Sequence, residues 1–131
     1  MIELKDITPE LIQNAEGAEL DRIAFVLKLA ASGYVIFDDV EQKLVYQGHL
    51  KEFRPATAIK QAMEIFYRQK PGTVAHITMY VGATPEDNMN AAEVNHIAEY
   101  ETHLARSEIS LACALTRACC LAALARIRSG E

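Results

Sequence analysis

The sequence predicts an α+β fold in which a small antiparallel sheet, a hairpin plus two further strands, packs with helices in a layered α/β sandwich. Segments with apolar residues three and four apart, typical of helices, share the chain with short β-branched and aromatic runs, typical of strands. The chain has 131 residues and half of them are hydrophobic, which fits one domain of ordinary size. We therefore expect residues 1–131 to form a single domain with one core.

Two helices are expected in the first third of the chain. Thr8 can cap the free N–H groups of a helix and the proline after it suits the first helical position, so a short helix should run to about Asn14. After Gly17, apolar residues recur at helical steps as far as Ala31, and Gly33 can end this second helix. The apolar positions on its expected buried face are Leu20, Ile23, Ala24, Leu27, Ala30 and Ala31.

A hairpin and an amphipathic helix are expected next. Residues 34–37 and 43–46 are β-branched and aromatic runs on either side of a polar stretch, which is typical of a hairpin. The following helix is expected to begin at Pro55. Its expected buried stripe comprises Ile59, Ala62, Met63 and Phe66, and its solvated face Lys60, Glu64 and Arg68.

The last third of the chain predicts a strand, a loop, an ambiguous segment and a long helix. Residues 73–81 alternate with a period of two, and residues 82–90 hold the Gly, Pro, Asp and Asn of a loop. Residues 93–104 fit either a strand or a helix, and we favour the strand. Ser107 can cap a final helix that runs to about Arg126 and is so apolar that most of its sides should be buried.

The cysteines and the hydropathy of the chain indicate in which cellular compartment the protein is expected to reside. Cys113, Cys119 and Cys120 are an odd, clustered set, which is not a disulfide framework and fits a reducing environment. The N-terminus carries acids where a secretory signal would carry bases, and no uninterrupted apolar run reaches the length of a membrane span. We expect a soluble, cytoplasmic protein without a membrane association.

A histidine and glutamate cluster is the one candidate metal site. On a helix, His96, Glu99 and His103 would share a face and could bind a divalent metal. On a single strand the two histidines would point to opposite faces, so with the strand favoured we expect no metal and no cofactor. Adjacent cysteines lack the spacer of redox motifs, and neither a Gly-x-Ser-x-Gly elbow nor a glycine-rich phosphate loop is present. No catalytic residue is therefore assigned.

A basic segment in the middle of the chain is the candidate binding site. Residues 51–70 hold five bases and two acids although the chain carries a net charge of −5. That net charge argues against generic nucleic-acid binding, but the local mixture of cations and an aromatic ring could hold a phosphate group or an acidic partner. The candidate residues are Arg54, Lys60, Tyr67, Arg68 and Lys70.

Three segments resemble the small phage proteins grouped as the phage ABA sandwich domain. Residues 17–24 are similar to the Gly and Glu-Leu-Asp opening helix of that family, and residues 54–59 to the start of its central helix. Residues 109–124 resemble its closing Ala, Leu and Cys helix, whereas the family's tryptophans are lacking. The resemblance implies a layered α/β fold encoded by a phage or prophage, in a family without assigned catalytic residues.

The leading functional hypothesis is a non-enzymatic phage or prophage accessory protein that binds a host component in the host cytoplasm. One version is an anti-defence inhibitor that acts through a protein interface or captures a nucleotide signal with Arg54, Lys60 and Arg68. The alternatives are a small metal-dependent hydrolase that uses the His/Glu cluster and a homodimeric structural protein whose last helix supplies the apolar interface.

Overall fold

The protein folds into four α-helices and two antiparallel sheets in a computed structural model that describes residues 2–30, 35–48, 51–97 and 102–130. The predicted α+β class is confirmed. In chain order the elements are η1 (Leu4–Asp6), α1 (Pro9–Asn14), α2 (Gly17–Val26), β1 (Val35–Asp38), β2 (Lys43–Tyr46), α3 (Ile59–Tyr67), β3 (Thr73–Tyr80), η2 (Pro85–Asp87), β4 (Met89–His96), β5 (Thr102–Ser107) and α4 (Leu111–Arg128).

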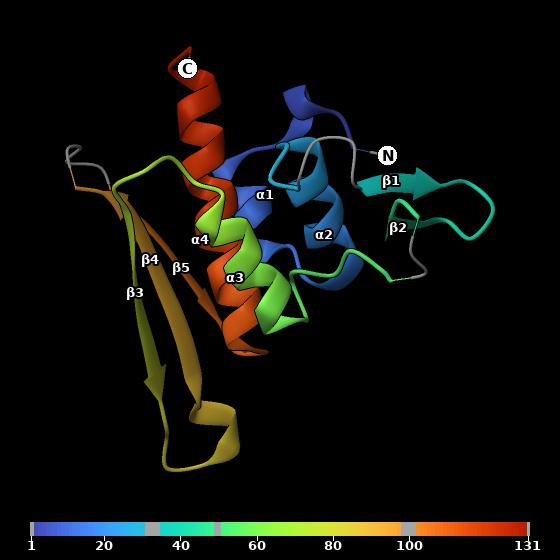
Figure 1. The fold of residues 1–131 in the computed structure, drawn as a ribbon. Coiled ribbons are helices and arrows are strands. Elements are labelled where there is room, and N and C mark those ends of the chain that lie inside the picture. Colours follow the sequence, from blue (N-terminus) through green and yellow to red (C-terminus); the bar gives the residue numbers. More distant parts are fainter. Residues whose placement is uncertain (1, 31–34, 49–50, 98–101, 131) are drawn as a thin grey trace.

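Helix α4 is the centre of the fold. One of its sides packs on β4 and β5, and its other sides contact α1, α2 and α3. Figure 1 shows the three-stranded sheet on one side of α4 and the β1–β2 hairpin at the opposite end of the molecule, beyond α2. This position explains the nearly unbroken apolar sequence of α4, which is buried from Ala112 to Cys120 without interruption. No helix in the described part of the chain combines the length and the hydropathy that would let it cross a membrane.

Small residues let α4 approach the sheet closely. Ala92 and Val94 of β4 and Ala105 of β5 are buried on the face that α4 covers. The helix begins one turn later than the sequence predicts, because Ser110 rather than Ser107 is its cap: the Ser110 hydroxyl accepts a hydrogen bond from the Cys113 N–H at 3.1 Å. The Ser107 hydroxyl instead accepts from the N–H groups of the two residues before the helix.

The three-stranded sheet has the order β3-β4-β5, with both pairs antiparallel. The strand that we favoured for residues 93–104 is two strands, β4 and β5, which pair with each other in a register that places Val94 opposite His103. The apolar pattern did not show the reversal between them, and residues 98–101 lie outside the described part of the chain. β3 and β4 extend as a long hairpin past the helices (Figure 1).

The β1–β2 hairpin is confirmed and forms a sheet of its own. The side chain of Asp38 closes its turn by accepting hydrogen bonds from the N–H groups of Val40 and Glu41. Leu44 is buried on the side that faces α2. The hairpin is thus anchored to the helical layer and does not extend the β3–β5 sheet.

Helix α2 ends seven residues before the glycine that the sequence indicated. The Lys28 N–H donates to the Phe25 carbonyl and the Leu29 N–H to the Ala24 carbonyl, each at 3.0 Å. Lys28 has a φ of 62°, in the left-handed region that glycine usually occupies at this position. The pattern is a Schellman motif, and it turns Leu29 into the core instead of continuing the helix. Ala31 and Gly33 lie outside the described residues.

Helix α3 begins at Ile59, after a turn at Pro55, and presents a different face to the core from the one expected. Ala62 is buried as predicted, but Ile59 and Met63 are about two-fifths exposed, at 42% and 41%. Ile65 and the polar Gln61 are buried in their place. Gln61 turns inward because its amide bonds the preceding loop: it donates to the Glu52 carbonyl at 3.0 Å and accepts from the Arg54 N–H at 2.6 Å.

Candidate ligand pocket

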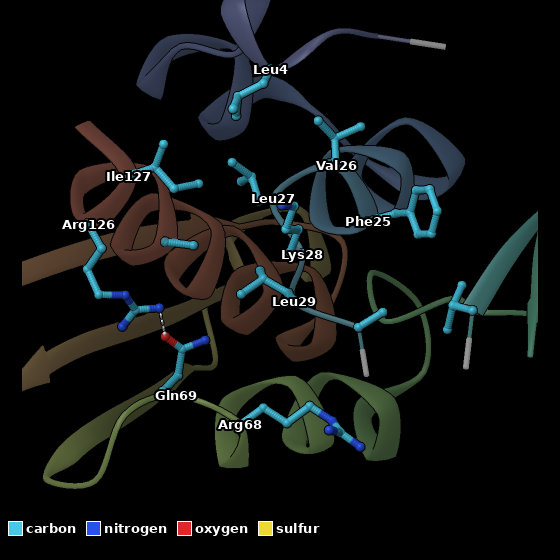
Figure 2. Close-up of a pocket in the computed structure, with 13 residues that line it drawn as sticks. Leu4, Phe25, Val26, Leu27, Lys28, Leu29, Arg68, Gln69, Arg126 and Ile127 are labelled. Carbon is cyan, nitrogen blue, oxygen red and sulfur yellow. Dashed lines mark hydrogen bonds between the residues drawn. The ribbon is translucent and has the colours of Figure 1, made fainter. Parts of the chain in front are cut away.

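A cavity of about 1010 Å³ lies where the C-terminal ends of α2, α3 and α4 meet (Figure 2). This volume is at the upper end of the range of small-molecule sites. Most of its wall is apolar, and three basic side chains and one amide are the exceptions. The lining residues are Leu4, Phe25, Val26, Leu27, Lys28, Leu29, Ala30, Val35, Arg68, Gln69, Ala123, Arg126 and Ile127.

Each cation of the pocket comes from a different helix end. Lys28 is placed by the left-handed turn that closes α2, and Arg68 is the residue at which α3 ends. Arg126 lies in the last turn of α4 and donates to the side-chain oxygen of buried Gln69 at 2.5 Å. Figure 2 shows this bond between the ends of α3 and α4. The hydrogen bond fixes Arg126, whereas the exposed side chains of Lys28 and Arg68 can adjust to a ligand.

The positive charges of the pocket face no carboxylate among the described lining residues. Helix C-termini carry partial negative charge, so their free carbonyls could have accepted hydrogen bonds from the cationic side chains. Backbone N–H groups already occupy carbonyls at all three ends: Phe25 of α2, Ile65 and Phe66 of α3, and Ala125 of α4. Lys28 and Arg68 are exposed and so can reach an anion that enters the cavity, whereas Arg126 is held by its hydrogen bond to Gln69.

The basic residues singled out in the sequence do not form one site. Arg68 lines the pocket, whereas Arg54 lies in a separate depression beside Asp21 and Glu52. Lys60 is exposed on α3, and the ring of Tyr67 is 71% exposed and rests against Phe66 with ring centroids 5.6 Å apart. Lys70 belongs to the turn before β3, where its carbonyl accepts from the Thr73 hydroxyl at 2.7 Å.

Lys28 and Arg126 are the site residues that sequence reasoning missed. Lys28 was expected to lie within a continuing helix, and Arg126 has the position of an ordinary basic residue at a helix end. The sequence offered one signal for this site, the pair of basic residues in the last turn of α4. Basic residues at this position are also favoured by the helix dipole, so the pair did not by itself indicate a binding site. The presence of Lys28 and Arg126 in the lining of one cavity depends on how three helices pack and is not a feature of local sequence.

The His/Glu cluster is arranged differently from either alternative considered. His103 pairs directly with Val94, and His96 lies two residues further along β4, so the two histidines share a face of the sheet. The single-strand argument that separated them was wrong because they belong to neighbouring strands. The His96 ring is hydrogen bonded through Nε2 to the Pro71 carbonyl at 2.7 Å. Glu99 lies outside the described residues, and among the described ones no three His, Cys, Asp or Glu side chains form a metal site.

Asp21 is a buried carboxylate beside the Arg54 depression, and burial raises its pKa from 3.8 to about 6. The Ala56 N–H, which donates to it at 2.8 Å, and the Arg54 charge oppose this shift only in part. An acid whose folded pKa is raised stabilises the fold fully below its unfolded pKa, and this contribution is lost as pH rises through the folded value.

We expect the Asp21→Asn variant to change the pH dependence of stability. The native chain should lose about 1 to 3 kcal/mol relative to the variant between pH 4 and pH 7, because Asn keeps an oxygen for the Ala56 N–H but cannot ionise. Urea unfolding at several pH values measures the difference. Asp39→Asn in the exposed hairpin turn is the control, and equal pH profiles for the native chain and the Asp21 variant would contradict the prediction.

A scan against protein families, a search of curated proteins and a search of solved structures each found no match to this chain. The resemblance to the phage ABA sandwich domain accordingly stays a prediction.

Proposed function

We propose that the protein is a non-enzymatic binding protein whose pocket takes a small phosphorylated molecule with an apolar or aromatic body, such as a nucleotide. The observation that carries the proposal is that Lys28, Arg68 and Arg126 line one mostly apolar cavity whose described lining residues include no carboxylate. Arginine and lysine are the side chains that most often bind phosphate groups.

The two kinds of lining residue suit the two parts of such a ligand. The cations would bind the phosphate groups, and Phe25 offers a ring against which a planar base can stack. The remaining wall is aliphatic and can bury an apolar part of the ligand. No step of bond making or breaking is needed for this role.

The phage context of the proposal comes from the sequence resemblance. In a host cytoplasm, a protein that sequesters a nucleotide signal would act as an anti-defence inhibitor, as the leading sequence hypothesis states. The pocket supports capture of a small molecule more directly than it supports a protein interface, because it is concave and combines apolar walls with fixed and adjustable cations.

We expect Lys28→Gly and Arg68→Ala each to weaken nucleotide binding at least about tenfold, since a charge-assisted hydrogen bond contributes about 1.5 to 3 kcal/mol. Lys28→Gly should also preserve or raise stability, because glycine adopts the left-handed conformation of this position without strain. Calorimetric titration with mononucleotides, dinucleotides and cyclic dinucleotides, each compared with inorganic phosphate, measures the affinities.

Lys60→Ala is the matched control, since Lys60 is an exposed cation on the same helix as Arg68 but does not line the pocket. Its affinity for the nucleotide should equal that of the native chain. Equal losses in Lys60→Ala and Arg68→Ala would indicate general charge attraction and refute the pocket. Absence of binding across the nucleotide panel would refute the proposed function itself.

A further inference from the structure

The two edges of the three-stranded sheet differ in how they are protected. On the β5 edge, the Leu104 carbonyl accepts from the Gln13 side chain at 2.9 Å and the Arg106 carbonyl from Arg117 at 2.6 Å. Side chains of α1 and α4 therefore occupy β5 groups that another strand would need. β3 forms the opposite edge, and among the described residues no side chain bonds its outward backbone groups in this way.

The backbone groups of β3 that point away from the sheet can be identified from the register. The Ile97 N–H donates to the Gly72 carbonyl at 3.0 Å, so residue 72 belongs to a hydrogen-bonded pair. Such pairs recur at every second residue of an antiparallel ladder. The N–H and C=O groups of Ala75, Ile77 and Met79 therefore point outward, and none of the described residues forms a hydrogen bond with them.

β3 also lacks the devices that usually prevent an edge strand from pairing. Its eight residues include no lysine, arginine, aspartate, glutamate or proline. Its large apolar side chains are open to solvent: Ile77 is 47% exposed, Met79 69% and Tyr80 62%. A long, uncharged, apolar edge of this kind is a template for another strand.

We propose that β3 pairs antiparallel with β3 of a second copy of this chain, about a two-fold axis at Ile77, so that two three-stranded sheets become one continuous sheet. In this register Ile77 lies opposite its own counterpart and the small Ala75 lies opposite the long Met79. On the other face, Val74 meets Tyr80 and His76 meets Thr78. Each of these pairs matches apolar with apolar or polar with polar, and about six backbone hydrogen bonds form across the axis.

Charged residues at the two ends of the paired β3 strands also favour a second copy of this chain as the partner. The tip that follows β3 carries Glu86 and Asp87, and the turn that precedes β3 carries Lys70. Antiparallel pairing about Ile77 brings the acidic tip of one copy alongside the basic turn of the other, at both ends of the interface. A second copy is thus complementary to β3 in backbone, side-chain size and charge.

An engineered thiol tests the register directly. Ile77→Cys places two cysteines opposite each other at a Cα separation of about 5.5 Å, within disulfide range. Mild oxidation should give a covalent dimer through this thiol, because the three native cysteines are buried. Met79→Cys is the matched control: it lies on the same face, and in this register its own counterpart is roughly 14 Å away. Mixing Ala75→Cys with Met79→Cys should give a disulfide-linked pair.

Sedimentation of unmodified chains supplies a second, independent measurement. The native chain should show a mass that rises with concentration, and Ile77→Lys should stay monomeric because two lysines would meet on the axis. Val40→Lys, an equivalent change at a 91% exposed residue of the hairpin turn, should dimerise like the native chain. A native monomer at about 0.5 mM, or equal crosslinking of Ile77→Cys and Met79→Cys, would overturn the proposal.

Discussion

Replacement of Arg117 by alanine is expected to lower the free energy of unfolding by about 4 kcal/mol. Arg117 is only 7% exposed, although it lies in the middle of α4. Its Nε donates to the Ala15 carbonyl at 2.9 Å and its Nη1 to the Arg106 carbonyl at 2.6 Å. The variant leaves two carbonyls without their donor, each at about 1 to 3 kcal/mol, and opens a gap in the packing. Urea unfolding measures the loss.

A second variant of Arg117 separates its hydrogen bonds from its charge, and a variant of Arg128 serves as the control. Arg117→Lys keeps the charge, but the lysine side chain has a single nitrogen that cannot reach both carbonyls in the same geometry. The free energy of unfolding of this variant should therefore fall between those of the alanine variant and the native chain. Arg128→Ala removes an exposed arginine of the same helix, which makes one hydrogen bond to the Ile7 carbonyl at 3.1 Å. A loss of less than about 1 kcal/mol is expected there. Equal losses in the two alanine variants would contradict the role given to Arg117.

The elements that could be predicted from the sequence are those whose signal is local. Thr8 caps α1 as expected, with its hydroxyl accepting from the Leu11 N–H at 3.1 Å. The hairpin, β3 and the buried final helix follow from turn residues and apolar periodicity. Each of these features is decided by neighbours a few residues away, which a single sequence displays.

The elements that could not be predicted are decided by distant contacts. Lys28 adopts a left-handed conformation that favours glycine, because the turn lets Leu29 enter the core. Gln61 replaces an apolar residue on the inner face of α3, because it bonds the backbone at Glu52 and Arg54. In both cases tertiary packing overrode the helical pattern.

The candidate pocket was predictable only in part for the same reason. Arg68 was selected from the basic composition of its segment, but Lys28 and Arg126 are 40 and more residues away from it in the chain. Three helix ends must pack together before these side chains share a cavity. Composition therefore identified one cation of the site, and the fold was required to identify the other two.

The three cysteines are expected to react with a thiol reagent at a rate set by the small population of unfolded chains. Burial raises the pKa of Cys119 from 9.0 to about 12 and the pKa of Cys120 well above its usual value, and all three thiols are buried. Because only the thiolate reacts, the shift alone should lower the reactivity of Cys119 about a thousandfold near pH 8. Labelling with a chromogenic disulfide should be slow in buffer and complete within seconds in denaturant, with all three thiols counted.

A cysteine introduced at Ser129 controls for the reagent, because this residue is exposed at the end of α4 and its thiol should react at once in the folded protein. Addition of a few molar urea below the unfolding midpoint should speed labelling of the native cysteines in proportion to the unfolded population. Rapid labelling of Cys119 or Cys120 in the folded chain, or a disulfide between them, would show an accessible redox pair and contradict a packing role. The expected pattern assigns these cysteines the role of small apolar residues that let α4 lie close to the elements around it.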